Sequence, residues 1–494
     1  MKKIPALLVT ALFLNMLASG VTAYADALSD GINAYERADY AQAMRLLRNP
    51  SLQANPRAQA QLGMLYENGQ GVALDYSEAL RLYSLAAAQG NAVAQTNLGR
   101  MTELGRGVAQ DYAEAIKWYR LAAAQDYPRA QVNLGLLYLD ESNPAADDAE
   151  ALKWLKLAAA QAYPRAHTYL GAMYQNGRGV PQDYAESLRW YRLAAAKKYA
   201  KAQSSLGLMY LHGLGVERNW AQAYKWMQLA AAQGNPEGQF QLGLLLANGD
   251  GENPKPDLAE ALKWYRLAAS QGYAYAQANL GSAYAYGQGV AKEYAEAIRW
   301  YQLAAEQGNA NAQANLAHMY KSGWGTAQDY ALAYYWYQKA ANQGLMAAQS
   351  NLGAMYASGQ GVAQDTAEAL KWYSLAAQQG SAEAQINLGV MAETGMAQAA
   401  GLPDYAEALK WYRLAASQGY APGGNNLGLL YAKGQGVELD YVRAYLWFNL
   451  GAASGHADSI RHQNIVQQQM NPQELAAAKT LAQECWQRNF KGCD

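Results

Sequence analysis

Residues 94–126 read AQTNLGRMTELGRGVAQDYAEAIKWYRLAAAQD, and this stretch decides the fold because it contains two helices and the turn between them. Gly105 stands where the first helix should end, since glycine readily adopts the left-handed backbone that terminates helices. Asp111 is a typical N-cap for a second helix, and Glu114 three residues later completes a capping-box-like pattern. Apolar residues then recur at helical spacing over 115–122, which predicts one buried face.

The same unit recurs along most of the 494 residues. Each copy has a Leu-Gly pair at one place, with a single alanine exception, and the spacing is 36 residues apart from one step of 38 and one of 39. These positions are Gly63, Gly99, Gly135, Gly171, Gly207, Gly243, Gly281, Ala317, Gly353, Gly389 and Gly428. Self-similarity on this scale predicts a repeat array rather than several globular domains.

The repeated glycine lies in the middle of the first helix, where it costs about 1 kcal/mol relative to alanine. We attribute it to a close approach of two helices. Two short helices cannot bury their apolar faces alone, so each unit must stack on its neighbours. The predicted fold is all-α, a right-handed α-solenoid superhelix of about eleven 36-residue helix–turn–helix repeats with terminal caps. By analogy with other helical-pair solenoids, the first helices should line its concave face.

These residues resemble the Sel1-like repeat, a relative of the tetratricopeptide repeat. The pattern Ala-x-Ala-Gln-x-Asn-Leu-Gly, then Tyr-x-x-Gly-x-Gly-Val and Asp-Tyr-x-Glu-Ala-x-Lys-Trp-Tyr-x-Leu-Ala-Ala, is nearly complete over 348–377. The resemblance covers 56–455, which leaves 26–55 as an N-terminal capping half-repeat and 456–494 as a C-terminal capping helix and tail. It implies protein–protein adaptor work in the bacterial envelope or at host surfaces, and it names no partner.

Residues 1–25 have the layout of a signal peptide, with two lysines before a largely apolar stretch. Ala23 and Ala25 are small residues at −3 and −1 of a cleavage site after Ala25. An uncleaved anchor is the alternative, although the apolar stretch is short for a membrane span. We therefore expect a periplasmic or secreted protein whose mature chain does not span a membrane. In such an oxidising compartment Cys485 and Cys493 are expected to form a disulfide.

A row of asparagines, which we call the asparagine ladder, occurs two positions before the repeated glycine. Helical geometry places this position roughly opposite the buried face, where amides could hydrogen-bond an extended peptide. The alternative is that each asparagine ties one repeat to the next. The ladder consists of Asn97, Asn133, Asn279, Asn315, Asn351, Asn387 and Asn426, and it is interrupted at Tyr169, Ser205 and Gln241.

A mildly basic patch is predicted beside the ladder, on the inner face of the second to fifth repeats. It comprises Arg100, Arg129, Arg165 and Lys201, although a solvated helix surface would explain any one of them. Ten of the 13 tryptophans share one repeat position, which predicts core packing. Trp324 lies instead in a turn and is the candidate for an exposed contact, with packing onto a neighbouring helix as the favoured alternative.

Catalysis finds little support in the sequence. The five histidines have no metal-binding spacing, and neither a Gly-x-Ser-x-Gly nor a Ser-x-x-Lys motif indicates a nucleophile. The acidic loop 140–150 could supply paired carboxylates, but a solvated loop is favoured. A net charge of −1 gives no indication of nucleic-acid binding. We expect no enzyme activity, no cofactor and no metal.

Three functions remain in competition. The leading one is a protein or peptide adaptor that uses its concave face. The second is a peptidoglycan-associated binder or a regulator of cell-wall enzymes, to which exposed aromatic residues could contribute. The third is a β-lactam hydrolase, associated with a cysteine-rich branch of the family, but the eleven units here contain no cysteine. Three repeats depart from the pattern. The third replaces its turn with residues 140–144, the sixth inserts two residues around 253–256, and the tenth inserts three around 397–403. These loops could carry function, although neutral drift is favoured.

Overall fold

A computed structural model describes residues 27–249, 256–396 and 401–493. These segments are helical with short connections and contain no strand. The predicted signal peptide lies outside the described residues. So do 253–255 of the insertion in repeat six and 397–400 of the insertion in repeat ten.

Each repeat consists of two short helices. The first helices are α3 (Pro56–Asn68), α5 (Ala92–Leu104), α7 (Pro128–Leu139), α9 (Pro164–Asn176), α11 (Ala200–His212), α13 (Pro236–Asn248), α15 (Ala274–Tyr286), α17 (Ala310–Ser322), α19 (Met346–Ser358), α21 (Ala382–Glu393) and α23 (Ala421–Lys433). The second helices are α4 (Tyr76–Ala88), α6 (Tyr112–Ala123), α8 (Asp148–Ala160), α10 (Tyr184–Ala196), α12 (Trp220–Ala232), α14 (Leu258–Ser270), α16 (Tyr294–Glu306), α18 (Tyr330–Asn342), α20 (Thr366–Gln378), α22 (Tyr405–Ala416) and α24 (Tyr441–Ala453).

Further helices flank the repeats: α2 (Tyr40–Leu47) and η1 (Pro50–Leu52) precede them, and α25 (Ala457–Gln467) and α26 (Pro472–Gln487) follow. Among the described helices, none combines the length and the apolar character needed to cross a membrane.

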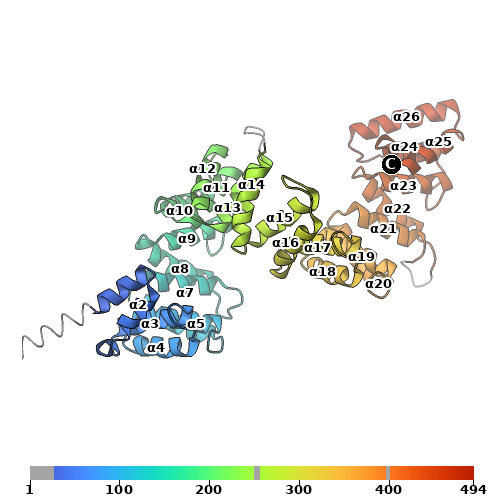
Figure 1. The fold of residues 1–494 in the computed structure, drawn as a ribbon. Helices are drawn as coiled ribbons and strands as arrows, with labels where there is room; N and C mark the ends of the chain where they lie inside the picture. The colour runs from blue at the N-terminus through green and yellow to red at the C-terminus, as the bar shows by residue number, and fades with distance from the viewer. Residues whose placement is uncertain (1–26, 250–255, 397–400, 494) are drawn as a thin grey trace, which may run out of the picture. The chain divides into compact units, whose positions relative to one another are not determined.

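The chain divides into two compact units, Met1–Gln241 and Leu242–Asp494. Within each unit the helix pairs follow one another in chain order, as Figure 1 shows. The first helices of neighbouring repeats also contact one another, α3 with α5 and α5 with α7 in one unit, α15 with α17 and α21 with α23 in the other. The predicted α-solenoid of eleven helix-pair repeats is therefore confirmed, and these first helices stack within their own unit.

The repeat's turn is formed largely as expected. Gly105 has a φ of 65° in the left-handed region and ends α5. The Asp111 side chain accepts a hydrogen bond from the Glu114 backbone N–H at 2.9 Å and so caps α6. The Glu114 side chain, however, pairs with Lys117 at 2.8 Å instead of returning to the cap. The reciprocal capping box forms in α26, between Asn471 and Glu474.

The mid-helix glycine packs against the second helix of its own repeat. A Cβ built on Gly281 would lie 2.6 Å from Cδ1 of Tyr301, closer than carbon atoms can approach. The tyrosine ring therefore occupies the space that a side chain on α15 would need. Ala317 is buried at the equivalent place in repeat eight, which shows that one methyl group can be accommodated there.

Buried glutamines connect consecutive repeats. The Gln313 amide donates to the Ala305 carbonyl at 3.0 Å, and its oxygen accepts from Gln343 at 2.8 Å. The same arrangement recurs around Gln95, Gln349 and Gln385. Each glutamine thus satisfies a backbone carbonyl at the end of one helix pair and reaches the next, which fixes the stacking of the repeats.

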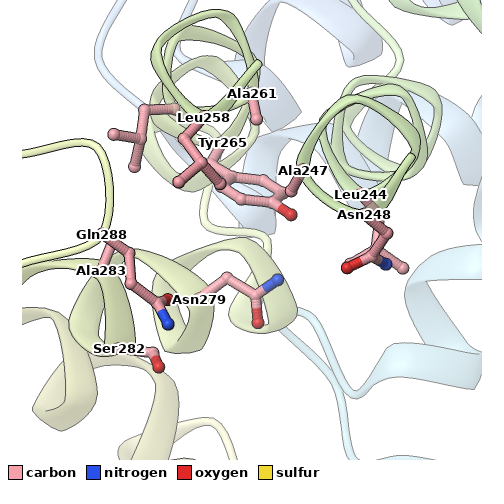
Figure 2. Close-up of a pocket in the computed structure, with 11 residues that line it drawn as sticks. Leu244, Ala247, Asn248, Leu258, Ala261, Tyr265, Asn279, Ser282, Ala283 and Gln288 are labelled. Carbon is pink, nitrogen blue, oxygen red and sulfur yellow. The ribbon is translucent and has the colours of Figure 1, made fainter. Parts of the chain in front are cut away.

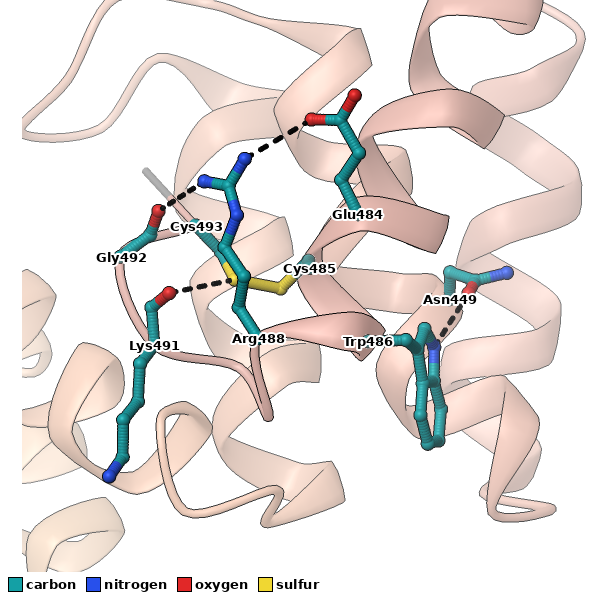
Figure 3. Close-up of a disulfide and its surroundings, with 8 residues drawn as sticks. All are labelled: Asn449, Glu484, Cys485, Trp486, Arg488, Lys491, Gly492 and Cys493. Atoms are coloured by element: carbon teal, nitrogen blue, oxygen red, sulfur yellow. Dashed lines mark hydrogen bonds and ion pairs between the residues drawn. A yellow bond between two sulfur atoms is a disulfide. The ribbon is translucent and has the colours of Figure 1, made fainter.

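A disulfide closes the C-terminal cap. Cys485 and Cys493 are bonded and buried, with Cα atoms 5.4 Å apart. Figure 3 shows Arg488 inside this loop, between the Glu484 carboxylate and the Gly492 carbonyl. Trp486 points away from the loop, and its indole N–H donates to Asn449 on α24 at 3.4 Å. The cross-link thus holds the tail against the end of the last helix.

Candidate partner-binding surface

Each asparagine of the ladder follows a second-helix tyrosine of the preceding repeat by 14 residues. The pairs are Tyr83–Asn97, Tyr119–Asn133, Tyr265–Asn279, Tyr301–Asn315, Tyr337–Asn351, Tyr373–Asn387 and Tyr412–Asn426. In the second, third, fourth and seventh of these pairs the asparagine amide lies near enough to the tyrosine hydroxyl to lower its pKa, against the larger effect of burial, which raises it. We call the place where the two meet a Tyr–Asn junction. Two of the three interruptions have the same cause, since Leu155 and Met227 replace the tyrosine before Tyr169 and Gln241, whereas the third, Ser205, follows Tyr191.

The ladder is less exposed than helical geometry alone predicts. Asn97 is 2% exposed and Asn133 is 9% exposed, so these two side chains are covered and not open to a ligand. The five later asparagines are half-buried. The reason is tertiary, because the stacked tyrosine of the preceding repeat covers a surface that would be open on an isolated pair of helices.

A second side chain completes some junctions and is missing from others. Four residues after the repeated glycine, Glu67 accepts a hydrogen bond from the Tyr83 hydroxyl at 2.9 Å, and Gln175 accepts one from Tyr191 at 3.0 Å. Glu103 and Glu393 do the same for Tyr119 and Tyr412. The equivalent residues in repeats six to nine are Ala247, Ala285, Lys321 and Ala357. At these junctions this position therefore supplies no carboxylate or carboxamide oxygen to the tyrosine.

The Tyr301 junction illustrates the consequence. Tyr301 is buried, and its hydroxyl has no hydrogen-bond partner of ordinary geometry. Ser282 and Asn315 are the neighbouring polar side chains that influence it. Burial raises the pKa of this tyrosine, as it raises that of Tyr191 to about 12. Both hydroxyls are therefore protonated at neutral pH and act as donors.

The basic patch is only partly available. The Arg100 guanidinium lies 2.7 Å from a Glu67 carboxylate oxygen and is neutralised by it. Arg165 donates to the Asn133 amide oxygen at 3.1 Å. The charged groups of Arg165 and Lys201 both lie over the Tyr169 ring, at 5.8 and 5.2 Å from its centroid.

Arg129 is half-buried on α7 and is near enough to Tyr35 to lower the pKa of that phenol, against the larger effect of burial, which raises it. The four predicted residues thus belong to the first helices of one unit. They do not form a uniformly positive surface, because Arg100 is paired.

Burial of Glu103 makes stability depend on pH. Desolvation raises the pKa of this carboxyl above its ordinary value, although the Tyr119 hydroxyl donates to it. The folded state therefore binds the proton more tightly than the unfolded state. This carboxyl consequently lowers stability as the pH rises from the ordinary carboxyl pKa through the raised one.

Glu103→Gln should remove that dependence, because an amide oxygen can still accept from Tyr119, as Gln175 does from Tyr191. We expect the variant to gain on the order of 1 kcal/mol at pH 7 and almost nothing at pH 4, as measured by urea unfolding at both pH values. Glu114→Gln on the exposed start of α6 is the control. A Glu103→Gln gain that is equal at both pH values would contradict the prediction.

The ladder residues on α15, α17 and α19 have mostly uncharged neighbours, whereas Asn387 on α21 has the exposed Glu383 beside it. On α15, α17 and α19 the ladder residues are flanked by Tyr275, Ser282, Asn311, His318, Ala347 and Ala354. Burial lowers the pKa of His318, so its ring is neutral at pH 7. Lys321 is a charged side chain on this surface, and its ammonium group contacts the Asn351 amide oxygen at 3.1 Å. We call this set, together with Asn279, Asn315, Asn351 and Asn387, the amide surface.

The tryptophans fall into two groups. Those at the shared repeat position are buried or half-buried, with Trp447 and Trp372 the most covered. Trp324 is 38% exposed and stacks on Tyr294 with ring centroids 5.4 Å apart. His318 contacts its edge at 5.0 Å. Trp324 is therefore anchored to neighbouring side chains and still presents part of its ring to solvent.

Within the described residues, histidine, cysteine, aspartate and glutamate side chains do not gather in threes as a metal site requires. What the repeats offer instead is a long array of amide and hydroxyl groups on stacked first helices. Helix-pair solenoids of this kind form extended binding surfaces.

The chain belongs to the Sel1 repeat family. The family's repeat model matches residues 56–91, 92–127, 128–163, 164–199, 200–235, 236–273, 274–309, 310–345, 347–381, 382–420 and 425–456. Sel1 repeat proteins are generally scaffolds for protein–protein interaction, and their solenoid fold is typically non-catalytic.

Solved structures include similar proteins. A protective antigen of uropathogenic Escherichia coli strains with an SLR fold is 35% identical, with a TM-score of 0.62 over 91% of this chain and 96% of that protein. A Sel1 repeat protein from Oxalobacter formigenes is 33% identical over 49% of this chain and 96% of its own, with a TM-score of 0.44. The comparison with curated proteins gives no match.

Proposed function

We propose that this protein is a non-catalytic scaffold of the bacterial cell envelope that binds an extended polypeptide along the amide surface of its second unit. The observation that carries the proposal is that alanine or lysine replaces glutamate or glutamine four residues after the repeated position in repeats six to nine, where the ladder asparagines are only half-buried. Amides and hydroxyls in a row complement a peptide backbone, which alternates donors and acceptors.

Export through the N-terminal signal is part of this proposal. The two cysteines near the C-terminus form a disulfide, as expected in an oxidising compartment. The E. coli protein that is 35% identical is a protective antigen, and an antigen that protects must be reached by the immune system. Both observations support a periplasmic or secreted location after cleavage at Ala25.

Site-specific photocrosslinking in envelope extract tests the binding surface. A photoreactive phenylalanine replaces Ala347, which is exposed beside Asn351. The same residue at Gln378, exposed on the second helix α20, is the control. We expect a polypeptide adduct from position 347 and none from position 378. Equal adducts at both positions would contradict the proposal.

The ladder itself is tested by Asn315→Ala/Asn351→Ala in the crosslinking background. Two lost hydrogen bonds at about 0.5–1.5 kcal/mol each predict roughly a tenfold weaker adduct. Gln302→Ala/Gln378→Ala removes two exposed second-helix amides and should leave the adduct unchanged. Thermal unfolding of both double variants ensures that a weaker adduct is not caused by loss of fold.

A peptidoglycan-associated role is the second candidate, favoured by the exposed ring of Trp324 next to the amide surface. Aromatic rings can bind the apolar faces of sugars. Cosedimentation with purified sacculi separates the two candidates, because Trp324→Ala should abolish glycan binding and leave polypeptide crosslinking at position 347 intact.

A further inference from the structure

A cavity of about 290 Å³ opens beside the Tyr265 junction in the second unit. Its apolar walls come from α13, α14 and α15 and include Leu244, Leu258 and Leu262. Asn248, Asn279, Ser282 and Gln288 supply neutral polar groups. Figure 2 shows the Tyr265 ring across this space, with Leu244 and Asn248 on one side, Leu258 on the other, and the Asn279 and Gln288 side chains below. The volume is at the lower end of small-molecule pockets, which suits a single side chain.

The cavity exists because small residues replace large ones at defined repeat positions. Ala247 occupies the position of Glu67 and Gln175, and Ser282 occupies the position of Arg100. In repeats one and two the equivalent space holds the Glu67 carboxylate, with Arg100 and Arg106 at 2.7 and 3.4 Å from it. In repeat four it holds the Gln175 amide, which accepts from the Tyr191 hydroxyl. The other repeats thus show which chemical group this kind of site accommodates.

The charges around the cavity indicate whether its occupant resembles the Glu67 carboxylate or the Gln175 carboxamide. Glu67 is stabilised by guanidinium groups, whereas the described residues that line the Ala247 cavity include no cation. A carboxylate placed there would lose hydration without gaining a counter-charge, which is costly. A carboxamide loses less, and the amides of Asn248, Asn279 and Gln288 can both donate to it and accept from it. The environment therefore resembles that of Gln175 more than that of Glu67.

We infer that the Ala247 cavity is an anchor pocket for a glutamine or asparagine side chain of the bound polypeptide. The inference rests on the proposed function, since it supplies one side-chain contact to a peptide that runs along the amide surface. Asn279 belongs to both the ladder and the pocket, so a peptide bound to the ladder passes the pocket mouth. The occupant takes the place that Gln175 fills within the chain's own fourth repeat.

Ligand-observed saturation-transfer NMR on the full chain tests the pocket with three small probes. Propionamide carries the carboxamide, propionate is its charged counterpart, and N-acetylglucosamine represents a glycan. We expect a propionamide signal at least fivefold stronger than that of propionate. An equal propionate signal, a stronger signal from the sugar, or no propionamide signal would each overturn the inference.

Ala247→Gln fills the pocket from within and should remove the propionamide signal while leaving the melting temperature unchanged or higher. Ala357→Gln makes the same change at the same repeat position in repeat nine and should leave the signal intact. A propionamide signal that persists in Ala247→Gln would refute the pocket. The probes need no polypeptide partner, so failure of this test leaves the crosslinking result untouched, and failed crosslinking leaves the NMR result interpretable.

Discussion

Gly281→Val is expected to destabilise the second unit by about 3 kcal/mol or more, because the new side chain must enter space that the Tyr301 ring occupies. The first Cβ alone would lie 2.6, 2.7 and 2.8 Å from three ring atoms. Tyr301 cannot move away freely, since it is itself buried between α15, α16 and α17. Helix propensity does not explain the loss, because valine is a slightly better helix former than glycine.

Urea unfolding and hydrogen exchange test this prediction. Gly281→Val should have a lower urea midpoint than the wild type and faster hydrogen exchange in α15 and α16. Local exchange is informative because a defect in one repeat acts mainly on its nearest neighbours. Gly281→Ala is the matched control, since Ala317 shows that the eighth repeat tolerates one methyl group. It should cost less than Gly281→Val, because it adds only the first carbon and the gain in helix propensity offsets part of the collision. A Gly281→Val variant as stable as the wild type would show that the close approach does not restrict this position.

Glu67→Ala is expected to cost about 3 kcal/mol, because it removes the one acceptor shared by three donors. The Glu67 side chain is fully buried and accepts from Arg100, Arg106 and the Tyr83 hydroxyl. Removing one partner of a buried ion pair typically costs 3–5 kcal/mol, and the partial exposure of Arg100 favours the lower end. Tyr83 would also be left buried without an acceptor.

Glu78→Ala in the same repeat provides the comparison. It removes an exposed pair with Arg81 on α4, for which less than about 0.5 kcal/mol is expected. Chemical unfolding of Glu67→Ala, Arg100→Ala and Glu67→Ala/Arg100→Ala gives the coupling energy of the buried pair by a double-mutant cycle. Equal costs for Glu67→Ala and Glu78→Ala would show that burial adds nothing to this carboxylate.

Several features of the fold were predictable because they depend on neighbours in the sequence. The left-handed turn at Gly105 and the cap at Asp111 are local and appear as expected. The mid-helix glycine predicted a close approach, and Tyr301 accounts for it. The capping-box expectation failed at Glu114 because Lys117, one turn further on, attracts its carboxylate.

The candidate site was less predictable. The burial of Asn97 and Asn133 was not foreseen because a helical wheel contains no information about the preceding repeat. One sequence signal could have corrected it, namely that each ladder asparagine follows a tyrosine by 14 residues and that leucine or methionine replaces the tyrosine before Tyr169 and Gln241. The residue four places after the repeated glycine was overlooked as well, since only the structure shows that it reaches the tyrosine hydroxyl.

The sequence by itself determined the helix pairs, their turns and the need to stack, because the period of apolar residues and the turn glycines act over a few neighbouring positions. The tertiary structure alone decided which polar groups are covered and where a cavity remains. Tyr265 and Asn279 are on different helices and meet only after two repeats have packed together. The residue four places after the repeated glycine lies beside such a pair. Glu67 and Gln175 fill this space with their own side chains, whereas Ala247 leaves a cavity.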